Sequence, residues 1–245
     1  MQTRMDCRDA LRFDIRQMTH TFFITGTDTG VGKTVFTTLM TEFLRSRKIR
    51  VAALKPVCSG GRGDARRLHR ALGGALTLDE INPWYFRAPL APVVAARQEH
   101  KTVLRHAALK HIRAIRRNFD VVLIEGAGGL LSPLGVDFNA RDLMRALAAT
   151  PVIVAANRLG VVNQLLLTLE ALPRNLQSRA RVVLMAPPKP TLAAAFNAGM
   201  LKRLARQPVH IIPWLGRKIG PETIHGMPQL QRSLGAISAG VQATD

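Results

Sequence analysis

The residues best suited to chemistry in this chain form a glycine-rich segment, residues 26–34, which reads GTDTGVGKT. A β-branched apolar run precedes the segment and a helical pattern follows it. Glycines at such a junction let backbone N–H groups point inward around an anion, and the helix N-terminus adds positive potential. Lys33 would reach the β- and γ-phosphates of a nucleotide, and the Thr34 hydroxyl would bind Mg²⁺. The segment therefore predicts a nucleotide-binding loop, although Gly26 and Gly32 are one residue further apart than in the strict motif.

Two other side chains with suitable chemistry, Lys55 and Glu125, each end a predicted apolar strand. Open α/β sheets bind ligands at the carboxyl ends of their strands, so both side chains are expected at the same edge as the loop. Lys55 would be a second cation for a transferring phosphoryl group, and Glu125 would be a ligand of Mg²⁺. Asp64 lies beyond the glycine-rich turn after Lys55, where it is either a further metal ligand or a helix N-cap.

The elements that must position these residues alternate between strands and helices. Apolar strand patterns cover residues 21–25, 50–55, 120–125, 152–156, 181–185 and 209–212. Helical patterns cover residues 33–48, 64–72, 103–117, 139–149, 164–172 and 191–205. Continuous apolar strands that alternate with helices imply a mostly parallel sheet covered on both faces. We therefore predict an α/β fold of three layers, with residues 21–245 forming a single P-loop domain.

The chain is strongly basic, with 35 Lys and Arg residues against 16 acidic residues and a net charge of +19. The basic residues are scattered over several predicted helices rather than gathered in one stripe, and aromatic residues make up only 5% of the chain. Single-stranded nucleic acids are typically bound by basic grooves with interleaved aromatic rings. We therefore expect no nucleic-acid partner.

Membrane and disulfide-rich classes are also excluded. No apolar run approaches the roughly 18 residues of a membrane-spanning helix, so no membrane partner is expected. The chain has only two cysteines and no apolar N-terminal signal, which favours a cytoplasmic location. Residues 1–20 carry Arg4, Arg8, Arg12 and Arg16 at helical spacing, but we interpret this segment as a dispensable N-terminal extension.

The order and spacing of several short segments resemble those of the dethiobiotin synthetase family. The segments lie between about residues 20 and 216 and read GTDTGVGKT, KPVCSGG, RGD, NPWYF, EGAGGLLSPL, RLGVVN and IPWL. The resemblance implies a fold of the MinD-like branch of P-loop proteins and a homodimer. It also implies a ligase of biotin biosynthesis, which forms the ureido ring of dethiobiotin from 7,8-diaminopelargonic acid, CO₂ and ATP, with Mg²⁺ as cofactor.

The resemblance also assigns roles to individual positions of this chain. Lys33 and Lys55 match the two catalytic lysines, around the reacting carbamate and the γ-phosphate. The nucleotide-binding positions are matched by Gly30, Val31, Gly32, Lys33, Thr34, Val35, Asp64, Glu125, Gly126, Ala127, Gly128, Pro213, Trp214 and Leu215. The metal ligands are matched by Thr34, Asp64 and Glu125. The substrate-binding positions are matched by Thr29, Ser59, Val161, Val162 and Asn163, of which the last three open a helix that receives the substrate carboxylate of the partner subunit.

The reaction implied by the resemblance needs positive charge more than it needs a nucleophilic side chain. A diamine captures CO₂ as a carbamate, whose oxygen attacks the γ-phosphate to give a carbamic-phosphoric anhydride. The second amine then closes the ring and expels phosphate. Because two anions must meet in the phosphoryl transfer, two lysines and Mg²⁺ are the groups that this chemistry requires.

The chain departs from the family where the nucleotide base is expected. An asparagine that pairs with adenine usually ends the strand that here reads Val182-Val183-Leu184-Met185. An acidic residue usually follows the Pro-Trp-Leu segment, yet residues 216–221 contain none. These departures predict weak selectivity for the base, together with an intact phosphate site.

Proteins of two other functional classes carry a loop of the same kind. A MinD- or ParA-like ATPase would act at DNA or membrane, but such proteins carry a lysine at the position of Asp28. A non-catalytic, nucleotide-binding regulatory domain would be expected to lack Lys55 or Glu125, and both are present.

Overall fold

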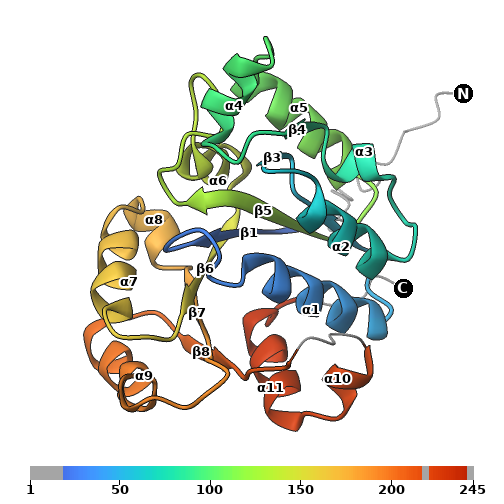
Figure 1. Ribbon diagram of the computed structural model, residues 1–245. Helices are drawn as coiled ribbons and strands as arrows, with labels where there is room; N and C mark the ends of the chain where they lie inside the picture. Colours follow the sequence, from blue (N-terminus) through green and yellow to red (C-terminus); the bar gives the residue numbers. More distant parts are fainter. Residues whose placement is uncertain (1–18, 217–220, 242–245) are drawn as a thin grey trace, which may run out of the picture.

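A computed structural model describes residues 19–216 and 221–241, and its centre is a six-stranded parallel sheet. The strand order is β2-β5-β1-β6-β7-β8. The strands are β1 His20–Gly26, β2 Val51–Leu54, β5 Val121–Gly129, β6 Thr150–Ala156, β7 Arg181–Met185 and β8 Val209–Ile212. Helices cover both faces of this sheet (Figure 1). The predicted three-layer α/β fold is therefore confirmed.

The helices follow the expected alternation, with several additions. They are α1 Lys33–Ser46, α2 Gly63–Leu72, α3 Leu78–Ile81, α4 Pro92–Gln98, α5 Arg105–Arg116, α6 Ala140–Leu147, α7 Val161–Glu170, α8 Arg174–Gln177, α9 Leu192–Leu204, α10 Pro221–His225 and α11 Pro228–Ile237. In Figure 1, α1, α10 and α11 lie together on one side of the sheet and α7 and α8 on the other. Helices α3, α4, α8, α10 and α11 were not predicted, and α7 begins three residues earlier than its pattern suggested.

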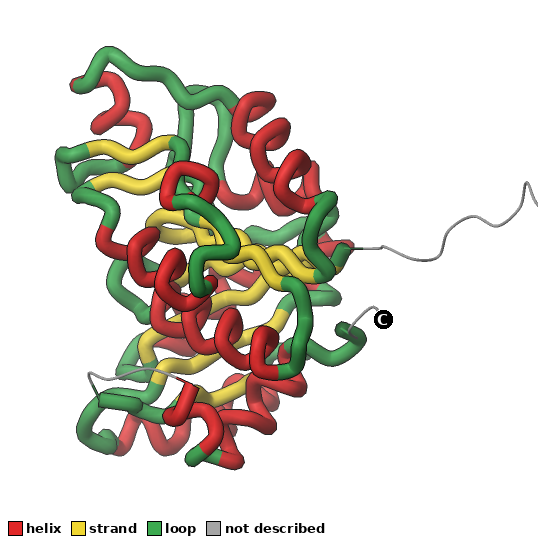
Figure 2. The backbone as a smooth tube through the Cα atoms, turned by 90° about the vertical axis from the view of Figure 1, so that its right-hand side faces the viewer, coloured by secondary structure: helices red, strands yellow, loops and turns green. Residues whose placement is uncertain are grey.

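A second, two-stranded sheet was also not predicted. It pairs β3, Val57–Ser59, with β4, Trp84–Phe86, in parallel. Figure 2 shows this short pair set apart from the main sheet. Strands of three residues are too short to show a period of two along the sequence. This sheet nevertheless matters for the site, because its first strand, β3, begins two residues after Lys55.

Burial follows the apolar pattern closely. The central strand β1 is buried from Thr21 to Gly26, as expected for a parallel strand covered on both faces. Helix α1 buries Phe36, Leu39, Met40 and Phe43, at the spacing of one helical face. This packing fixes the first turn of α1 against the carboxyl end of β1. The loop between the two elements is thus held at both of its ends.

No helix in the described part of the chain is long and apolar enough to span a membrane. The proposed extension, residues 1–20, lies almost entirely outside the described residues. Its dispensability remains a prediction, as does the single-domain organisation of residues 21–245.

Candidate phosphate and magnesium site

The loop between β1 and α1 has the backbone geometry of an anion cradle. Gly30 and Gly32 adopt φ values of 72° and 102°, backbone conformations that residues with a Cβ atom rarely adopt. Gly26 needs its hydrogen for another reason, since a Cβ there would lie 2.8 Å from the Asp28 carbonyl oxygen. Gly32 precedes the first turn of α1, whose N–H groups therefore face the loop. The sequence prediction of a phosphate loop agrees with this geometry.

Lys33 lies folded back into this loop. Its Nζ donates a hydrogen bond of 2.7 Å to the carbonyl oxygen of Asp28, and the residue is buried. Burial, and secondly the Lys55 ammonium, lower the pKa of Lys33 from its usual value to about 8. Among the described residues, no carboxylate is in direct contact with this ammonium. An anionic ligand in the loop would supply the missing negative charge.

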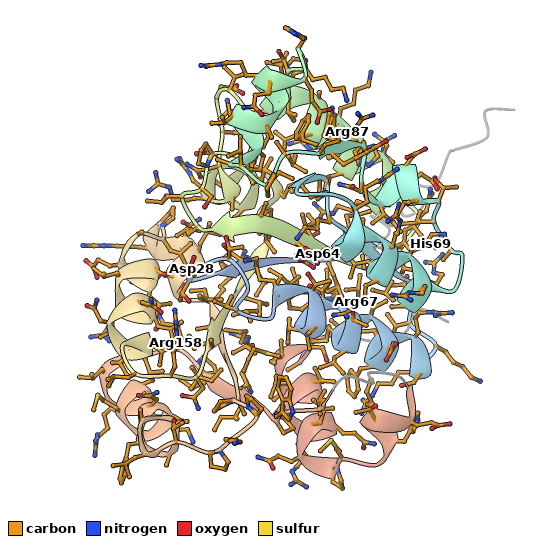
Figure 3. All side chains as sticks on the ribbon, in the orientation of Figure 1. Asp28, Asp64, Arg67, His69, Arg87 and Arg158 are labelled. Carbon is orange, nitrogen blue, oxygen red and sulfur yellow. The ribbon has the colours of Figure 1, made fainter. Side chains whose placement is uncertain are left out.

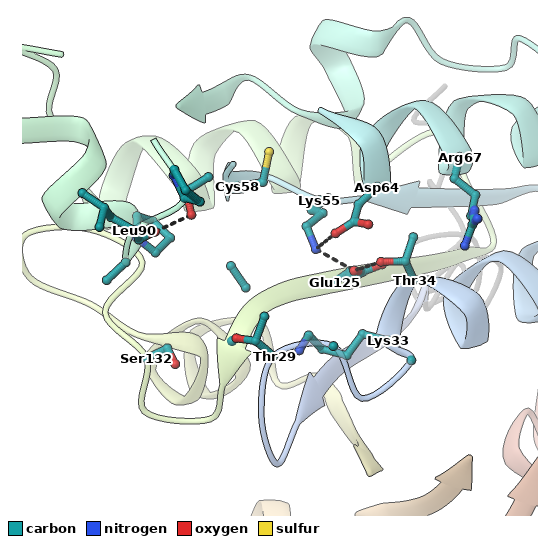
Figure 4. A pocket seen from close by; sticks show the side chains of 18 of the residues that line it. Thr29, Lys33, Thr34, Lys55, Cys58, Asp64, Arg67, Leu90, Glu125 and Ser132 are labelled. Carbon is teal, nitrogen blue, oxygen red and sulfur yellow. Dashed lines mark hydrogen bonds and ion pairs between the residues drawn. The ribbon is translucent and has the colours of Figure 1, made fainter. Parts of the chain in front are cut away.

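A compact charged centre joins side chains from α1, α2 and β5 with that of Lys55, which directly follows β2 (Figure 4). The Glu125 Oε1 atom accepts hydrogen bonds of 2.6 Å from both Thr34 Oγ1 and Lys55 Nζ. Lys55 Nζ also lies 2.9 Å from Oδ2 of Asp64. Glu125 and Lys55 are buried, whereas the Asp64 side chain is about half exposed, at 53%. The residues selected from the sequence therefore meet at one point.

The charges of this centre depend on one another. Burial alone would lower the pKa of Lys55, but Glu125 and Asp64 outweigh burial and raise that pKa above its usual value. For Asp64, burial would raise the pKa, but the neighbouring Lys55 lowers it overall. Both groups therefore stay ionised. Asp64 lies in the first turn of α2 rather than at its N-cap, which is Arg62, so the N-cap interpretation was wrong.

Lys55 is held in place by residues that the sequence did not single out. The buried Asn82 side chain donates from Nδ2 to the backbone oxygen of Lys55 at 2.6 Å. The Lys55 N–H in turn donates to the Ile81 carbonyl oxygen at 3.0 Å. Arg62 donates to the Asn82 carbonyl oxygen at 2.8 Å. The turn after α3 thus positions the lysine, and only the NPWYF resemblance pointed to this stretch.

A cavity of about 770 Å³ opens over the charged centre. Among the predicted residues, those lining it are Thr29, Gly30, Gly32, Lys33, Thr34, Val35, Lys55, Ser59, Asp64, Glu125, Ala127 and Gly128. The lining also includes residues that had not been predicted, namely Cys58, Arg67, Pro89, Leu90, Ala91, Pro92, Ser132 and Pro133. Val31 and Gly126 are next to lining residues in the chain but do not line the cavity themselves.

The expected substrate end of this cavity is lined by short polar side chains. Ser59 Oγ donates to the Leu90 carbonyl oxygen at 2.5 Å. On the opposite wall, Ser132 Oγ accepts a hydrogen bond of 2.9 Å from the Gly129 N–H. Gly128 between these walls has a φ of 68°, which permits a close turn of the backbone. The hydroxyls of Thr29 and Ser59 thus border the same space.

Two groups of predicted residues lie away from the cavity lining. Pro213, Trp214 and Leu215 follow β8, and the Trp214 side chain is 54% exposed. Val161, Val162 and Asn163 form the first turn of α7, and Val161 is fully buried in the core. The structure of one chain therefore does not bring these six residues to the charged centre.

The charged centre fits a hard divalent cation. Thr34, Asp64 and Glu125 offer only oxygen atoms, which Mg²⁺ prefers. The second carboxylate oxygen of Glu125, Oε2, is buried without a hydrogen-bond partner among the described residues. No group of three His, Cys, Asp or Glu residues arranged for a metal occurs in the described part of the chain.

Comparisons with known proteins identify the family. The chain is 39% identical over 198 residues to an ATP-dependent dethiobiotin synthetase from Anaeromyxobacter dehalogenans, an alignment that covers 78% of this chain and 89% of the relative. It belongs to the dethiobiotin synthetase family. A second family member, from Bacillus licheniformis, is 34% identical over 212 residues, covering 84% and 90% of the two chains. A third, from Rhodococcus erythropolis, is 42% identical over 186 residues, covering 72% and 80%.

Two further matches concern the fold. Residues 20–217 match a family model described as an AAA domain. A crystal structure of a ParA family ATPase from Chlorobium tepidum superposes with a TM-score of 0.55 at 14% identity, covering 88% of this chain and 97% of that one. At this identity the likeness concerns the fold alone. This chain therefore shares its overall fold with that ATPase.

Proposed function

We propose that this chain is an ATP-dependent ligase that forms the ureido ring of dethiobiotin from 7,8-diaminopelargonic acid, CO₂ and ATP. The observation that carries the proposal is the convergence of Lys33, Lys55, Thr34, Asp64 and Glu125 on one cavity. Membership of the dethiobiotin synthetase family names the substrates. The catalytic and binding roles given below to individual residues are part of the proposal.

The first step joins CO₂ to the substrate and then transfers the γ-phosphoryl group of ATP to the product. One substrate amine attacks CO₂ and loses a proton, which gives a carbamate. A carbamate oxygen then forms a bond to the γ-phosphorus while the bond from that phosphorus to the bridging oxygen breaks, and ADP leaves. Lys33 and Lys55 lie where they can oppose the charge of both anions. Because neither lysine forms a covalent bond, their contribution is electrostatic and positional.

The second step closes the ring. The other amine attacks the carbonyl carbon of the mixed anhydride, the bond to the phosphate oxygen breaks, and a proton leaves the nitrogen. Phosphate departs with the oxygen that came from the carbamate. The protein needs no nucleophilic side chain for this step, because it has only to hold the second amine near the carbonyl carbon. The hydroxyls of Thr29 and Ser59 border the space in which the substrate would lie.

Thr34, Asp64 and Glu125 are the residues that would hold Mg²⁺. A bound Mg²⁺ would neutralise charge on the nucleotide phosphates. Lys55 Nζ contacts both carboxylates, which partly balances their charge. The Oε2 atom of Glu125 is buried with no hydrogen-bond partner among the described residues, so it is free to bind a further cation.

We further propose that the active form is a homodimer, in which the first turn of α7 binds the substrate carboxylate of the partner. That turn lies away from its own cavity, while helix N-termini favour anions. Leu159 and Leu167, beside and within α7, expose 86% and 61% of their surface. Helix α9 exposes Leu192 and Phe196 to a similar extent. Exposed apolar side chains of this size favour a protein interface.

A cytoplasmic location, expected from the sequence, also remains a prediction.

The proposal is tested by phosphate release from ATP with and without 7,8-diaminopelargonate and bicarbonate. Release that requires both compounds, with dethiobiotin formed in equal amount, is the expected result. The matched control is Lys33→Ala, which should release no phosphate under any of these conditions. Phosphate release that is unaffected by the diamine would instead indicate an ATPase of another function.

A further inference from the structure

We propose that Arg67 binds the α- and β-phosphates of the nucleotide, the two that are not transferred, and so helps to set nucleotide affinity. The inference rests on the proposed function, which supplies the nucleotide. The resemblance to the family assigned no role to Arg67.

Arg67 lies on α2, three residues after Asp64, so the two side chains project from the same face of the helix. Both residues line the cavity over the charged centre. Figure 3 places Arg67 between α2 and α1, and in Figure 4 its guanidinium lies beyond Thr34, on the side opposite Leu90. Arg67 therefore borders the nucleotide half of the cavity rather than the half lined by Ser59.

The guanidinium of Arg67 has no hydrogen-bond or ion-pair partner among the described residues. The other two cations of the cavity are engaged, Lys33 with the Asp28 carbonyl oxygen and Lys55 with two carboxylates. Arg62, which precedes the same helix, forms an ion pair with Asp79 and donates a hydrogen bond to the Asn82 carbonyl oxygen. Arg67 is thus a cation at the cavity wall that is ready to take an anionic ligand.

The identity of that anion follows from the neighbours of Arg67. The resemblance places Lys33 and Lys55 around the γ-phosphate and carries the nucleotide-binding segment on to Val35, which lines the cavity from the first turn of α1. An arginine beside this part of α1 would face the two inner phosphates. A guanidinium is suited to the task because its planar array of N–H donors can hold two phosphate oxygens at once.

Such a contact would change affinity more than rate. The α-phosphate carries the same charge in the ground state and in the transition state, so a contact with it contributes to binding alone, whereas charge grows on the β-phosphate as ADP leaves and a contact there also favours the transition state. We therefore expect Arg67 to affect the dissociation constant of a nucleoside diphosphate and the KM for ATP. The KM for the diamine should stay nearly unchanged, and the turnover number should fall by a smaller factor than the KM for ATP rises.

The test is titration of Mg-ADP and Mg-CDP into the full-length protein by calorimetry. Arg67→Gln should weaken the binding of both diphosphates about tenfold, or 1.4 kcal/mol, and by the same factor for each. Arg67→Lys should fall between that variant and the unaltered protein. The matched control is Arg66→Gln, which changes an exposed neighbouring arginine that does not line the cavity.

Three results would overturn the assignment. One is Mg-ADP binding by Arg67→Gln within twofold of the unaltered protein, and another is an equal loss in Arg66→Gln. The third is a loss for Mg-ADP without one for Mg-CDP, which would mean that Arg67 contacts the base. Because these titrations need no catalysis, they test Arg67 even if the protein forms no dethiobiotin, so the two proposals can fail separately.

Discussion

At the scale of single residues, the two lysines of the site differ in what holds them. Lys55 is paired with Glu125 and Asp64, and this pairing is what allows a carboxylate as buried as that of Glu125. Lys33 lies near Lys55 and has only a carbonyl oxygen in direct contact. Lys55 therefore raises the free energy of unfolding, whereas the buried charge of Lys33 lowers it unless an anion is bound beside the ammonium.

Replacing each lysine by methionine should separate these contributions. We expect Lys55→Met to lower the free energy of unfolding by about 3 kcal/mol, because it leaves the Glu125 carboxylate buried without its partner. Lys33→Met should leave that free energy equal or higher, since it removes a cation whose pKa burial has lowered. Both variants should form no dethiobiotin. Chemical denaturation and a product assay measure the two effects.

A double variant is the control for this prediction. Lys55→Met combined with Glu125→Gln removes the stranded charge, so it should recover part of the lost stability while remaining inactive. A Lys55→Met protein as stable as the unaltered one, or a Lys33→Met protein that still turns over, would contradict the account of the two lysines.

At the scale of elements, the turn between α3 and β4 determines where Lys55 lies. Asn82→Ala would leave the backbone oxygen of Lys55 without its buried donor. We expect a loss of stability of about 1–3 kcal/mol. The turnover number should also fall about tenfold, because the lysine would be less well fixed, with little change in the KM for ATP. Steady-state kinetics and denaturation measure both effects.

Asn175→Ala is the matched control, because it changes an exposed asparagine on α8. It should leave both quantities unchanged. If Asn82→Ala loses stability but keeps full turnover, Asn82 supports the fold and not the position of Lys55.

The ends of β7 and β8 support the expectation of weak base selectivity. Met185 packs against the loop, where a Cβ on Gly32 would lie 2.9 Å from its Cγ. The Met185 carbonyl oxygen already accepts from the Asn157 N–H, and the Ala186 N–H already donates to the Ile212 carbonyl oxygen. These backbone groups are therefore engaged within the protein and not free to pair with a base.

Turnover with four nucleoside triphosphates at equal Mg²⁺ tests this expectation. Because an apolar contact discriminates weakly between rings, CTP and GTP should support the reaction within about tenfold of ATP, or 1.4 kcal/mol. As a control, Lys33→Ala should abolish turnover with every nucleotide. A preference for ATP of more than about a thousandfold would show that another group pairs with adenine.

The elements also show how far a sequence can predict a site. Long apolar runs predicted the six main strands, and the ends of three of them placed Lys33, Lys55 and Glu125 near one another. Asn82 and Arg67 could not be found in this way, because their roles depend on a turn and a helix face fixed by tertiary packing. The three-residue strands β3 and β4 were missed because they are too short to show a period of two along the sequence.

At the scale of the whole molecule, the central question is whether two chains share their sites. Asn163→Asp should leave the fold intact, since a carboxylate near a helix N-terminus is favourable, but it should repel a substrate carboxylate. This variant and Lys33→Ala should each be nearly inactive alone. Mixed in equal amounts and allowed to exchange, they should regain about a quarter of full activity, because half of the dimers would carry one intact site.

The control is each variant mixed with itself, which should regain nothing. Absence of recovery in the mixture despite proven exchange, or a fully active monomer in sedimentation, would contradict the shared site. The Asn163 side chain is exposed, so a lost fold would not be the reason for inactivity.

The central claim, that a carbamate oxygen attacks the γ-phosphate, has a direct test. The unaltered protein is given ATP, 7,8-diaminopelargonate and ¹⁸O-labelled bicarbonate in ordinary water, and the released phosphate is analysed by mass spectrometry before the label exchanges. Because phosphate departs with the carbamate oxygen, one ¹⁸O atom is expected in each phosphate formed from labelled carbamate. Phosphate without ¹⁸O would show that water attacks the nucleotide, and would contradict the proposed reaction.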